Sequence, residues 1–366
     1  MSASMSAPNA AMIACVVGTR PEVVKMAPII AALRRRNLPH CVIATGQHHD
    51  WSMMGSFLAG FGITVDHQLT LTTRSLLGSF LEIATGLGEL FAAEPPKLVL
   101  AVGDTTTVVA AAFAARKTGS AFGHVEAGLR AFSRELPEEE HRICADALAD
   151  LLFAPTTIAV ANLAREHVNG RVLLTGNTVL DALREHRPAV ATARHGVLVT
   201  IHRQETVDDP NELATVFAQI ERLGRDHDVV WPLHLRTRAK AEEAQLALPK
   251  YVTITEPLGH VEFLSRLARA RLVVTDSGGV QEEAAILGTP CVTVRAHTER
   301  VETLEAGVGL LALPSQIFDV AAQIFADWSS FARPLPELYG DGRAGEKIAH
   351  ACDEWLSRSI TREMVA

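Results

Sequence analysis

Basic charge and cysteine are both scarce in this sequence. Its 366 residues include 34 lysines and arginines against 42 aspartates and glutamates, which gives a formal net charge of −8. A general nucleic-acid binder usually shows a basic excess or a clustered basic face, so the composition argues against that class. The five cysteines are odd in number, widely spaced and without a CxxC pair. We interpret them as buried small hydrophobic residues of a cytoplasmic protein, not as a disulfide framework or a zinc site.

Several familiar signatures are also missing. We find no apolar run that approaches the ~18–20 residues of a membrane helix. Residues 1–10 lack the basic and apolar regions of a secretory signal, and we expect them to form a disordered tail. No P-loop, GxSxG elbow or HExxH motif occurs. The adjacent pair His48-His49 has no second cluster to complete a metal site, so we expect neither a metal nor a cofactor.

What the chain does contain is a regular alternation of short apolar runs and longer segments with helical spacing. The runs are continuously apolar, as strands buried on both faces of a parallel sheet are. Alternating strands and helices predict parallel sheets covered by helices, and a break near 187–195 divides the pattern in two. We therefore predict an α/β protein with two Rossmann-like lobes, 11–186 and 196–340. Residues 187–195 would be a linker, and 341–366 a C-terminal helix that packs back on the first lobe. The predicted strands are 12–17, 40–45, 97–102, 171–175, 196–201, 228–233, 251–255, 271–275 and 291–294.

Charged residues follow the predicted strands of the first lobe. Arg20 and Lys25 lie at the start of a helix, where free N–H groups attract anions, so they suit a phosphate or carboxylate; a solvated basic pair is the alternative. Asp104 follows the strand 97–102 and could simply cap the next helix. Glu126 ends a short apolar segment, where no helix or strand needs a carboxylate. Glu138 has a structural explanation in the helix dipole, yet acids after several strands of one lobe are harder to explain by structure alone.

The second lobe has its own candidates at strand ends. His202 and Arg203 leave the strand 196–201, although a lone histidine is more often structural. Ser277-Gly278-Gly279 follows the strand 271–275 and opens a helix, so backbone N–H groups can approach a phosphate there. Arg300 follows the strand 291–294. In sheets of this kind, ligands bind beyond the carboxyl ends of the strands, where all these residues are predicted to lie.

The motifs taken together resemble those of the non-hydrolysing UDP-N-acetylglucosamine 2-epimerases. In order, they are GTRPEVVKMAP, TGQH, GDTTT, HVEAGLR, PEEEHR, GNTVLD, HR-x-E, TDSGGVQEE and TER. The resemblance implies a glycosyltransferase-B-like architecture with the active site in the cleft between the lobes, and a homodimer. By the same resemblance, Asp104, Glu126, Glu138 and His202 match catalytic positions. Substrate-binding positions match Arg20, Lys25, Phe263, Ser277, Gly278, Gly279, Glu283 and Arg300, and an activator site would include Gln47, His48, Arg203 and His234.

The implied reaction is reversible epimerisation at C2, between UDP-N-acetylglucosamine and UDP-N-acetylmannosamine. The C2 proton is not next to a carbonyl, so we expect elimination of UDP to a glycal and re-addition, with no metal or nicotinamide. The product would supply N-acetylmannosamine units for surface polysaccharides. The intact GTRPE and TER motifs favour N-acetylglucosamine itself as the sugar. A hydrolysing epimerase, an epimerase of a modified UDP-sugar, a glycosyltransferase and a non-catalytic sugar-nucleotide sensor remain alternatives.

Overall fold

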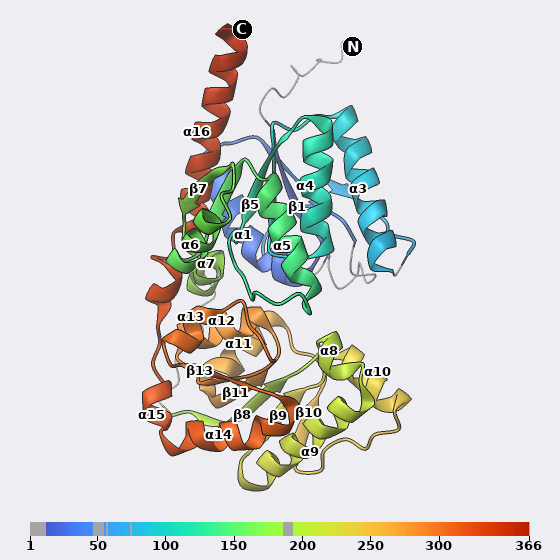
Figure 1. Ribbon diagram of the computed structural model, residues 1–366, viewed down its shortest axis with the longest axis vertical. Coiled ribbons are helices and arrows are strands. Elements are labelled where there is room, and N and C mark those ends of the chain that lie inside the picture. Colours follow the sequence, from blue (N-terminus) through green and yellow to red (C-terminus); the bar gives the residue numbers. More distant parts are fainter. Residues whose placement is uncertain (1–11, 47–54, 56–57, 74, 186–192, 366) are drawn as a thin grey trace. The chain divides into compact units, whose positions relative to one another are not determined.

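The computed structural model describes residues 12–46, 55, 58–73, 75–185 and 193–365, with side chains as far as 358 (Figure 1). The tail predicted at 1–10 and most of the linker predicted at 187–195 lie outside the described residues. The chain divides into two compact units. Unit 1 comprises 1–182 and 339–366, and unit 2 comprises 183–338. Each unit is built on one sheet.

Unit 1 contains a seven-stranded sheet in the order β3-β2-β1-β4-β5-β6-β7. Every pairing in it is parallel, which confirms the predicted α/β class. Both faces of the central strands are buried, as their continuous apolar sequences predict. The strands are β1 (Ile13–Val17), β2 (His40–Ala44), β3 (His67–Gln68), β4 (Leu98–Val102), β5 (Ala121–Val125), β6 (Leu151–Ala154) and β7 (Arg171–Leu174).

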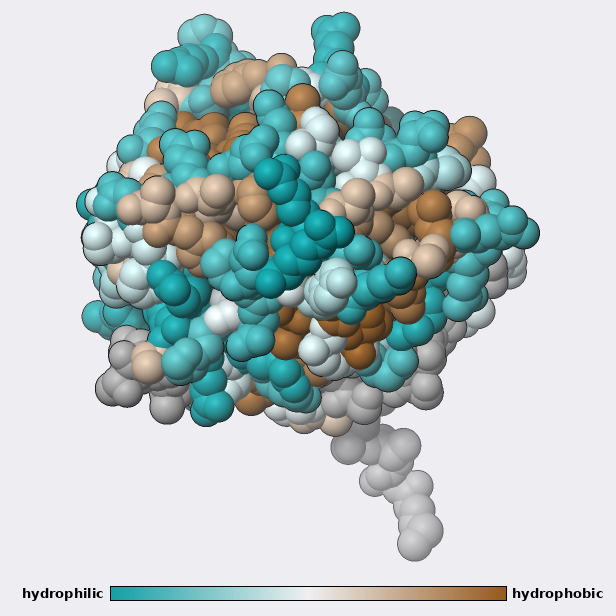
Figure 2. Space-filling view, turned by 90° about the horizontal axis from the view of Figure 1, so that it is seen from below, coloured by the Kyte–Doolittle hydropathy of each residue, from teal (hydrophilic) through white to brown (hydrophobic). Residues whose placement is uncertain are grey.

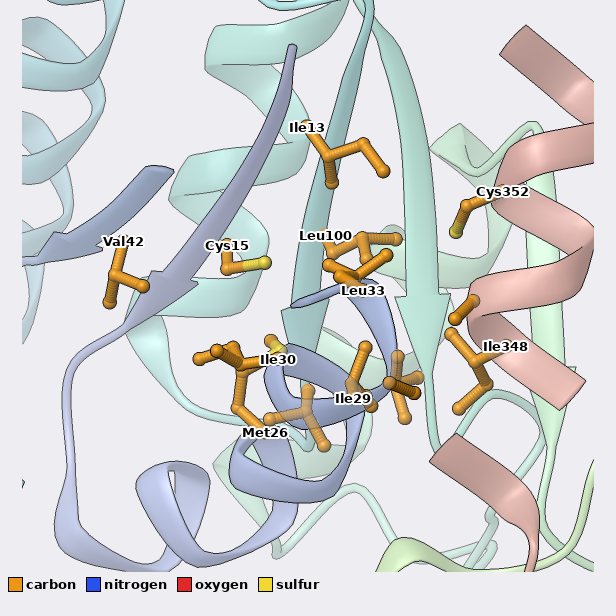
Figure 3. Close-up of a cluster of buried hydrophobic side chains, with 14 of the residues drawn as sticks. Ile13, Cys15, Met26, Ile29, Ile30, Leu33, Val42, Leu100, Ile348 and Cys352 are labelled. Carbon is orange, nitrogen blue, oxygen red and sulfur yellow. The ribbon is translucent and has the colours of Figure 1, made fainter. Parts of the chain in front are cut away.

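Alternate residues of β1 point into two different hydrophobic cores. Ile13 and Cys15 pack with α1 and α16 on one face (Figure 3), and Val17 belongs to the same cluster. Ala14 and Val16 pack with α3, α4 and α5 on the other face. The helices of this unit are α1 (Arg20–Arg35), α3 (Leu76–Ala93), α4 (Thr106–Thr118), α5 (Pro137–Leu148), α6 (Thr157–Arg165), α7 (Thr178–Glu185), which runs into unit 2, and α16 (Ala344–Val365).

The last helix, α16, belongs to the core of unit 1. Its Ile348 and Cys352 are fully buried in the same cluster as α1, as Figure 3 shows. Asp181 fixes the start of α16 by accepting hydrogen bonds from the backbone N–H groups of Ala344 and Gly345, at 3.2 and 2.9 Å. Burial of each large apolar side chain contributes about 1.5–3 kcal/mol, so α16 is an integral part of this unit.

Helix α3 differs from the expectation that no apolar run reaches membrane length. By length and composition it could cross a membrane, with a mean hydropathy of 1.4 over 18 residues. It packs on α4 through buried Ile83, Leu87 and Phe91, whereas Leu76, Leu77 and Leu81 are exposed. Sequence inspection missed it because Glu82 and Glu89 interrupt the run. One such helix is weak evidence for a membrane, and the absence of a membrane partner stays a prediction.

Unit 2 contains a six-stranded parallel sheet in the order β10-β9-β8-β11-β12-β13. Its core includes fully buried Trp231, which packs edge-on against Phe217 of α9. The face in Figure 2 is mostly hydrophilic, with hydrophobic residues in separate areas. The strands are β8 (His195–Thr200), β9 (Val229–Pro232), β10 (Val252–Thr255), β11 (Ala270–Thr275), β12 (Cys291–Val294) and β13 (Gly309–Ala312). The helices are α8 (Gln204–Val207), α9 (Pro210–Asp226), α10 (Leu235–Glu243), α11 (His260–Arg269), α12 (Gly278–Leu287), α13 (Val301–Glu305), α14 (Ile317–Ala326) and α15 (Trp328–Phe331), with 3₁₀ turns η1 (Pro314–Gln316) and η2 (Pro336–Tyr339).

Candidate active site

The polar residues of unit 1 gather where the neighbouring strands β2, β1, β4 and β5 end. Thr45 follows β2, Gly18 follows β1, and Asp104 and Glu126 lie just after β4 and β5. The turns are packed tightly: a Cβ on Gly18 would lie 2.1 Å from Oγ1 of Thr107. Because the strands are parallel, these residues share one edge of the sheet, where ligands of such folds bind.

Lys25 and Glu126 form a buried ion pair across this edge. The Lys25 Nζ lies 2.7 Å from Oε2 of Glu126, and the two side chains are 10% and 2% exposed. Glu126 has a φ of +70°, an unfavourable value for a residue other than glycine. Such strain costs about 1–3 kcal/mol and persists where the surrounding structure imposes it. The pair therefore fixes a possible proton acceptor beside a cation.

Asp104 is bound by a cation from another element. Arg142 of α5 donates to Oδ2 of Asp104 and also, at 2.8 Å, to Oε2 of Glu139. Helix α4 is capped instead by Thr105, whose Oγ1 accepts from the N–H of Thr107 at 3.2 Å. The structure therefore gives the capping role to Thr105, and the Asp104 carboxylate, 26% exposed, is paired with Arg142.

The three acids at the start of α5 are not equivalent. Glu139 is buried and accepts hydrogen bonds from the backbone N–H groups of Ala131 and Phe132, at 3.0 and 2.8 Å. Glu140 is exposed, and Glu138, the predicted catalytic position, is half-buried. Among these three acids, Glu139 is the one that holds the preceding loop through hydrogen bonds.

Behind these side chains lies a buried histidine that the sequence analysis did not assign. His124 of β5 bonds through Nδ1 to Oδ1 of Asp146 at 2.6 Å, and through Nε2 to the Gly103 carbonyl at 2.8 Å. Asp146 also accepts from the N–H of Gly128 and from Arg130. Burial lowers the pKa of His124, but the charge of Asp146 and the hydrogen bonds to Asp146 and Gly103 raise it above its ordinary value. The network fixes the turns on either side of Asp104 and Glu126.

Glu22, in the first turn of α1, is a second unassigned residue. It is 3% exposed, and its Oε2 accepts from the N–H groups of Gly18 at 2.5 Å and Thr19 at 3.2 Å. Its Oε1 accepts from Oγ1 of Thr105 at 2.5 Å. Burial raises the pKa of Glu22 to about 7, although these hydrogen bonds oppose the shift. A threonine followed three residues later by glutamate at a helix start was the available sequence signal.

In unit 2, a buried aspartate organises the turn that follows β8. Oδ2 of Asp276 accepts from the backbone N–H groups of His202 and Arg203, at 2.8 and 2.7 Å. The ring of His202 lies with its centroid 5.0 Å from that of His234. These two histidines, predicted for separate catalytic and activating sites, lie side by side.

The two glycines that open α12 have different surroundings. A Cβ on Gly278 would lie 2.7 Å from Oε1 of Glu299, whereas a Cβ on Gly279 would meet nothing within 4 Å. Packing against Glu299 therefore explains Gly278, whereas Gly279 lies next to open space. Together with Ser277 at the N-cap, this helix start offers N–H groups to an anion.

Arg300 is held by glutamates of its own unit. It is 3% exposed, with its Nε 2.5 Å from Oε1 of Glu282 and its NH1 3.4 Å from Oε1 of Glu299. Arg295 lies 3.0 Å from the other oxygen of Glu299. Arg300 thus has a structural role that the sequence analysis did not foresee, and its contact with a ligand stays a prediction.

The other predicted binding residues lie at partly or fully buried positions, or outside the described residues. His260 lies 3.0 Å from Oε1 of Glu283, which is nearly buried, and Phe263 is half-buried on α11. Arg20 is half-buried at the start of α1. Gln47 and His48 lie outside the described residues. Within the part of the chain that is described, no three His, Cys, Asp or Glu side chains are grouped so that they could hold a metal ion.

Comparison with known proteins decides the family. A family model described as UDP-N-acetylglucosamine 2-epimerase matches residues 31–353. The chain belongs to this family. The UDP-N-acetylglucosamine 2-epimerase of Methanococcus maripaludis is 33% identical over 361 residues, which cover 92% of this chain and 97% of the relative. The UDP-2,3-diacetamido-2,3-dideoxy-D-glucuronate 2-epimerase of Pseudomonas aeruginosa is 34% identical, with 91% and 97% covered.

Solved structures of the epimerase family agree with this fold. The Methanocaldococcus jannaschii enzyme, in complex with UDP-N-acetylglucosamine and UDP, matches with a TM-score of 0.84 and 32% identity, over 94% of this chain and 99% of its own. The Neisseria meningitidis enzyme, bound to UDP-N-acetylglucosamine, matches with a TM-score of 0.84 and 30% identity, over 94% and 100%. The recognition made from the motifs is confirmed.

Proposed function

We propose that this protein interconverts UDP-N-acetylglucosamine and UDP-N-acetylmannosamine by inverting C2. The observation that carries the proposal is the pairing of Lys25 with Glu126 and of Arg142 with Asp104 at adjacent strand ends, in a chain of the epimerase family. Each carboxylate is set beside a cation. This arrangement suits proton transfers coupled to the departure of an anionic leaving group.

The reaction would proceed by elimination and re-addition. A carboxylate takes the proton from C2, the C1–O bond breaks, and UDP leaves with the bonding electrons, so that a C1–C2 double bond forms. In the return step, the phosphate oxygen bonds to C1 while a proton is delivered to the opposite face of C2. Asp104, Glu126, Glu138 and His202 are the proposed groups for these transfers.

Nucleotide binding is assigned to unit 2. The start of α12, with Ser277, Gly278 and Gly279, would receive the diphosphate through backbone N–H groups, as helix starts commonly do. Glu283, Arg300 and Phe263 would contact the nucleotide or hold its site. Arg20 and Lys25 would approach the substrate from unit 1.

The deciding experiment is incubation with UDP-N-acetylglucosamine in deuterated water, followed by proton NMR. The proposal expects UDP-N-acetylmannosamine with deuterium at C2 and no effect of EDTA. Retention of the original hydrogen would contradict elimination. Release of free N-acetylmannosamine would identify a hydrolysing enzyme.

A second candidate substrate is a modified UDP-sugar. Its support is the relative that acts on a diacetamido-glucuronate, which is 34% identical, as close as the N-acetylglucosamine enzyme at 33%. Overall identity therefore does not separate the two sugars. Comparing kcat/KM for both UDP-sugars would rank them, and a higher value for the glucuronate would replace the first substrate.

An activator site remains a proposal, with Arg203 and His234 as its described members and Gln47 and His48 as the others. Its support is the contact between the rings of His202 and His234, which would link activator to catalysis. Epimerisation of UDP-N-acetylmannosamine should then show a lag that added UDP-N-acetylglucosamine removes. His234→Ala should abolish this activation, and hyperbolic kinetics without a lag would exclude it.

We also propose a cytoplasmic homodimer. Its support is the exposed apolar surface of α3 and α4, where Leu76, Leu77, Leu81 and Phe113 are 60%, 70%, 53% and 37% exposed. Light scattering should give twice the chain mass of 39.4 kDa, and the double variant L77E/L81E should give one chain mass. A dimer that survives this variant would place the interface elsewhere.

A further inference from the structure

We propose that Glu22 is a positioning residue that, when ionised, ties the turn after β1 to the turn after β4 and so holds Asp104 in place for catalysis. The inference rests on the proposed function, because Asp104 is one of its proton-transfer groups. Glu22 lies outside the set of residues to which the sequence motifs gave a role, and it would act through its neighbours rather than on the substrate.

The geometry of Glu22 joins two separate strand ends. Its Oε2 is held by the N–H groups of Gly18 and Thr19, which follow β1. Its Oε1 accepts a hydrogen bond from the hydroxyl of Thr105. Thr105 follows β4 and is the residue next to Asp104. Since β1 and β4 are adjacent strands, this one carboxylate sets the distance between their two turns.

A simple helix cap accounts for only part of this arrangement. A glutamate at the third position of a helix often accepts from the N-cap backbone, as Glu22 does with Thr19. Such a residue normally lies at the surface, whereas Glu22 is 3% exposed. The hydroxyl of Thr105 adds a bond that α1 does not need, and Thr105 already caps α4.

The three hydrogen bonds all require Glu22 to accept. Two come from backbone N–H groups, which can only donate. The third comes from the Thr105 hydroxyl, whose oxygen already accepts a hydrogen bond from the N–H of Thr107. A proton on Glu22 would occupy an acceptor site and reverse or break the Thr105 bond. The ionised form is therefore the one that ties the turns, and its raised pKa of about 7 puts the loss of this tie in a physiological range.

Among the described residues, the charged groups on the elements around Glu22 include Asp104, Lys25, Arg142 and Arg20. Asp104, on the turn after β4, raises the pKa of Glu22 further, after burial. Lys25, on the same helix, is paired with Glu126 after β5. Arg142 of α5 is paired with Asp104, and Arg20 precedes Glu22 in the first turn of α1.

The first test separates positioning from stability. Thr105→Val removes the bond to Glu22 and the cap of α4, while Thr105→Ser keeps the hydroxyl. We expect Thr105→Val to lower kcat about 10–100-fold with little change in KM, as loss of a charge-assisted hydrogen bond implies, and Thr105→Ser to restore most of it. Ser75→Ala, which removes the exposed cap of α3, is the matched control and should leave kcat unchanged. Normal kcat in Thr105→Val would overturn the inference.

The second test follows protonation. The kcat of the wild type should rise with pH through about 7, the pKa of Glu22. Glu22→Gln should have a lower kcat without that inflection. A Glu22→Gln profile that keeps the wild-type inflection would assign the titration to another group and overturn the pH dependence.

A readout without substrate distinguishes failure of this inference from failure of the proposed function. Hydrogen exchange of peptides covering 13–25 and 103–108, corrected for intrinsic rates, should show protection lost as the pH falls below about 7 in the wild type. Glu22→Gln should show no such change. If the wild type epimerises no UDP-sugar, the proposed function is wrong, but hydrogen exchange still tests whether Glu22 ties the two turns. Protection that does not change with pH in the wild type would refute this role of Glu22.

Discussion

The two sheets end in edges that carry different kinds of chemistry. In unit 1 the edge presents carboxylates, each set against a cation, as in Lys25–Glu126 and Arg142–Asp104. In unit 2 the edge presents a helix start with Gly278 and Gly279, and its acids Asp276, Glu282 and Glu299 are used to hold other protein groups. Two similar sheets thus present different groups at their strand ends: paired side chains in unit 1, proposed to transfer protons, and backbone N–H groups in unit 2, proposed to bind an anion.

The largest expected effect is a loss of turnover when the carboxylates of unit 1 are replaced. Asp104→Asn and Glu126→Gln keep size and hydrogen bonding but remove the proton-transfer group, so turnover should fall about 10²–10⁴-fold. UDP affinity should stay unchanged, because the nucleotide is proposed to bind to unit 2. Glu140→Gln, at an exposed acid of α5, is the control for loss of one negative charge. Steady-state kinetics would measure turnover, and calorimetry would measure UDP affinity. Near-normal turnover in both Asp104→Asn and Glu126→Gln would mean that these acids have structural roles only.

The next effect is on the stability of unit 2. Arg300→Ala leaves Glu282 and Glu299 buried without this partner, which should lower the free energy of unfolding by about 3–5 kcal/mol. Arg300→Lys keeps the charge and should lose less. Denaturant unfolding measures both variants. If Arg300→Ala unfolds like the wild type but loses UDP affinity, the arginine serves the ligand rather than the fold.

A smaller effect concerns Glu22 and pH. In the folded protein Glu22 keeps its proton up to about pH 7, whereas in the unfolded chain it ionises near its ordinary value of 4.5. Folding therefore retains a proton in this range, and the free energy of global unfolding falls as the pH rises from 4.5 to about 7, because the ionised carboxylate is buried, even though its hydrogen bonds to the two turns form on ionisation. At 1.36 kcal/mol per pKa unit, the wild type should lose roughly 3 kcal/mol relative to Glu22→Gln between pH 5 and pH 8. Equal pH dependence of unfolding in the two proteins would contradict this.

The smallest expected effect separates the roles of the two glycines at the start of α12 in unit 2. Gly278→Ala should destabilise the protein by about 1–3 kcal/mol, because its Cβ would press on Glu299. Gly279→Ala meets no protein atom within 4 Å and should leave the melting temperature unchanged. If the diphosphate binds there, Gly279→Ala should still weaken UDP binding. Unaltered UDP affinity in Gly279→Ala would place the diphosphate elsewhere.

Most of the fold could be predicted from continuous apolar runs. The nine predicted strands correspond to observed ones, whereas β3, β5, β6 and β13 were missed. The sequence of β5, AFGHV, contains Gly123 and the buried His124, so it does not look like a strand until Asp146 and Gly103 are seen to satisfy the histidine. Its pairing partners are distant in sequence, and no local pattern reveals them.

Prediction of the site was less complete. Motif order indicated Lys25 and Glu126, but only three-dimensional structure shows that they form an ion pair across 101 residues of sequence. Conversely, nothing in the sequence indicated that Arg300 is paired inside the protein, because Glu282 comes from α12 and the direction of the neighbouring Glu299 side chain is set by the fold. The pKa of Glu22 depends on burial, which a residue's own neighbours in sequence do not determine.

The position of α16 in the core of unit 1 has a consequence for biosynthesis. Unit 2 is an insertion within unit 1, and the two segments of unit 1 that flank it are in contact: the backbone N–H of Asn177 donates to the Tyr339 carbonyl at 2.9 Å. On the ribosome, all of residues 183–338 are made before Ile348 and Cys352 can fill the core beside α1. Unit 2 can therefore finish folding first, and unit 1 must wait, incomplete, for the last helix to emerge.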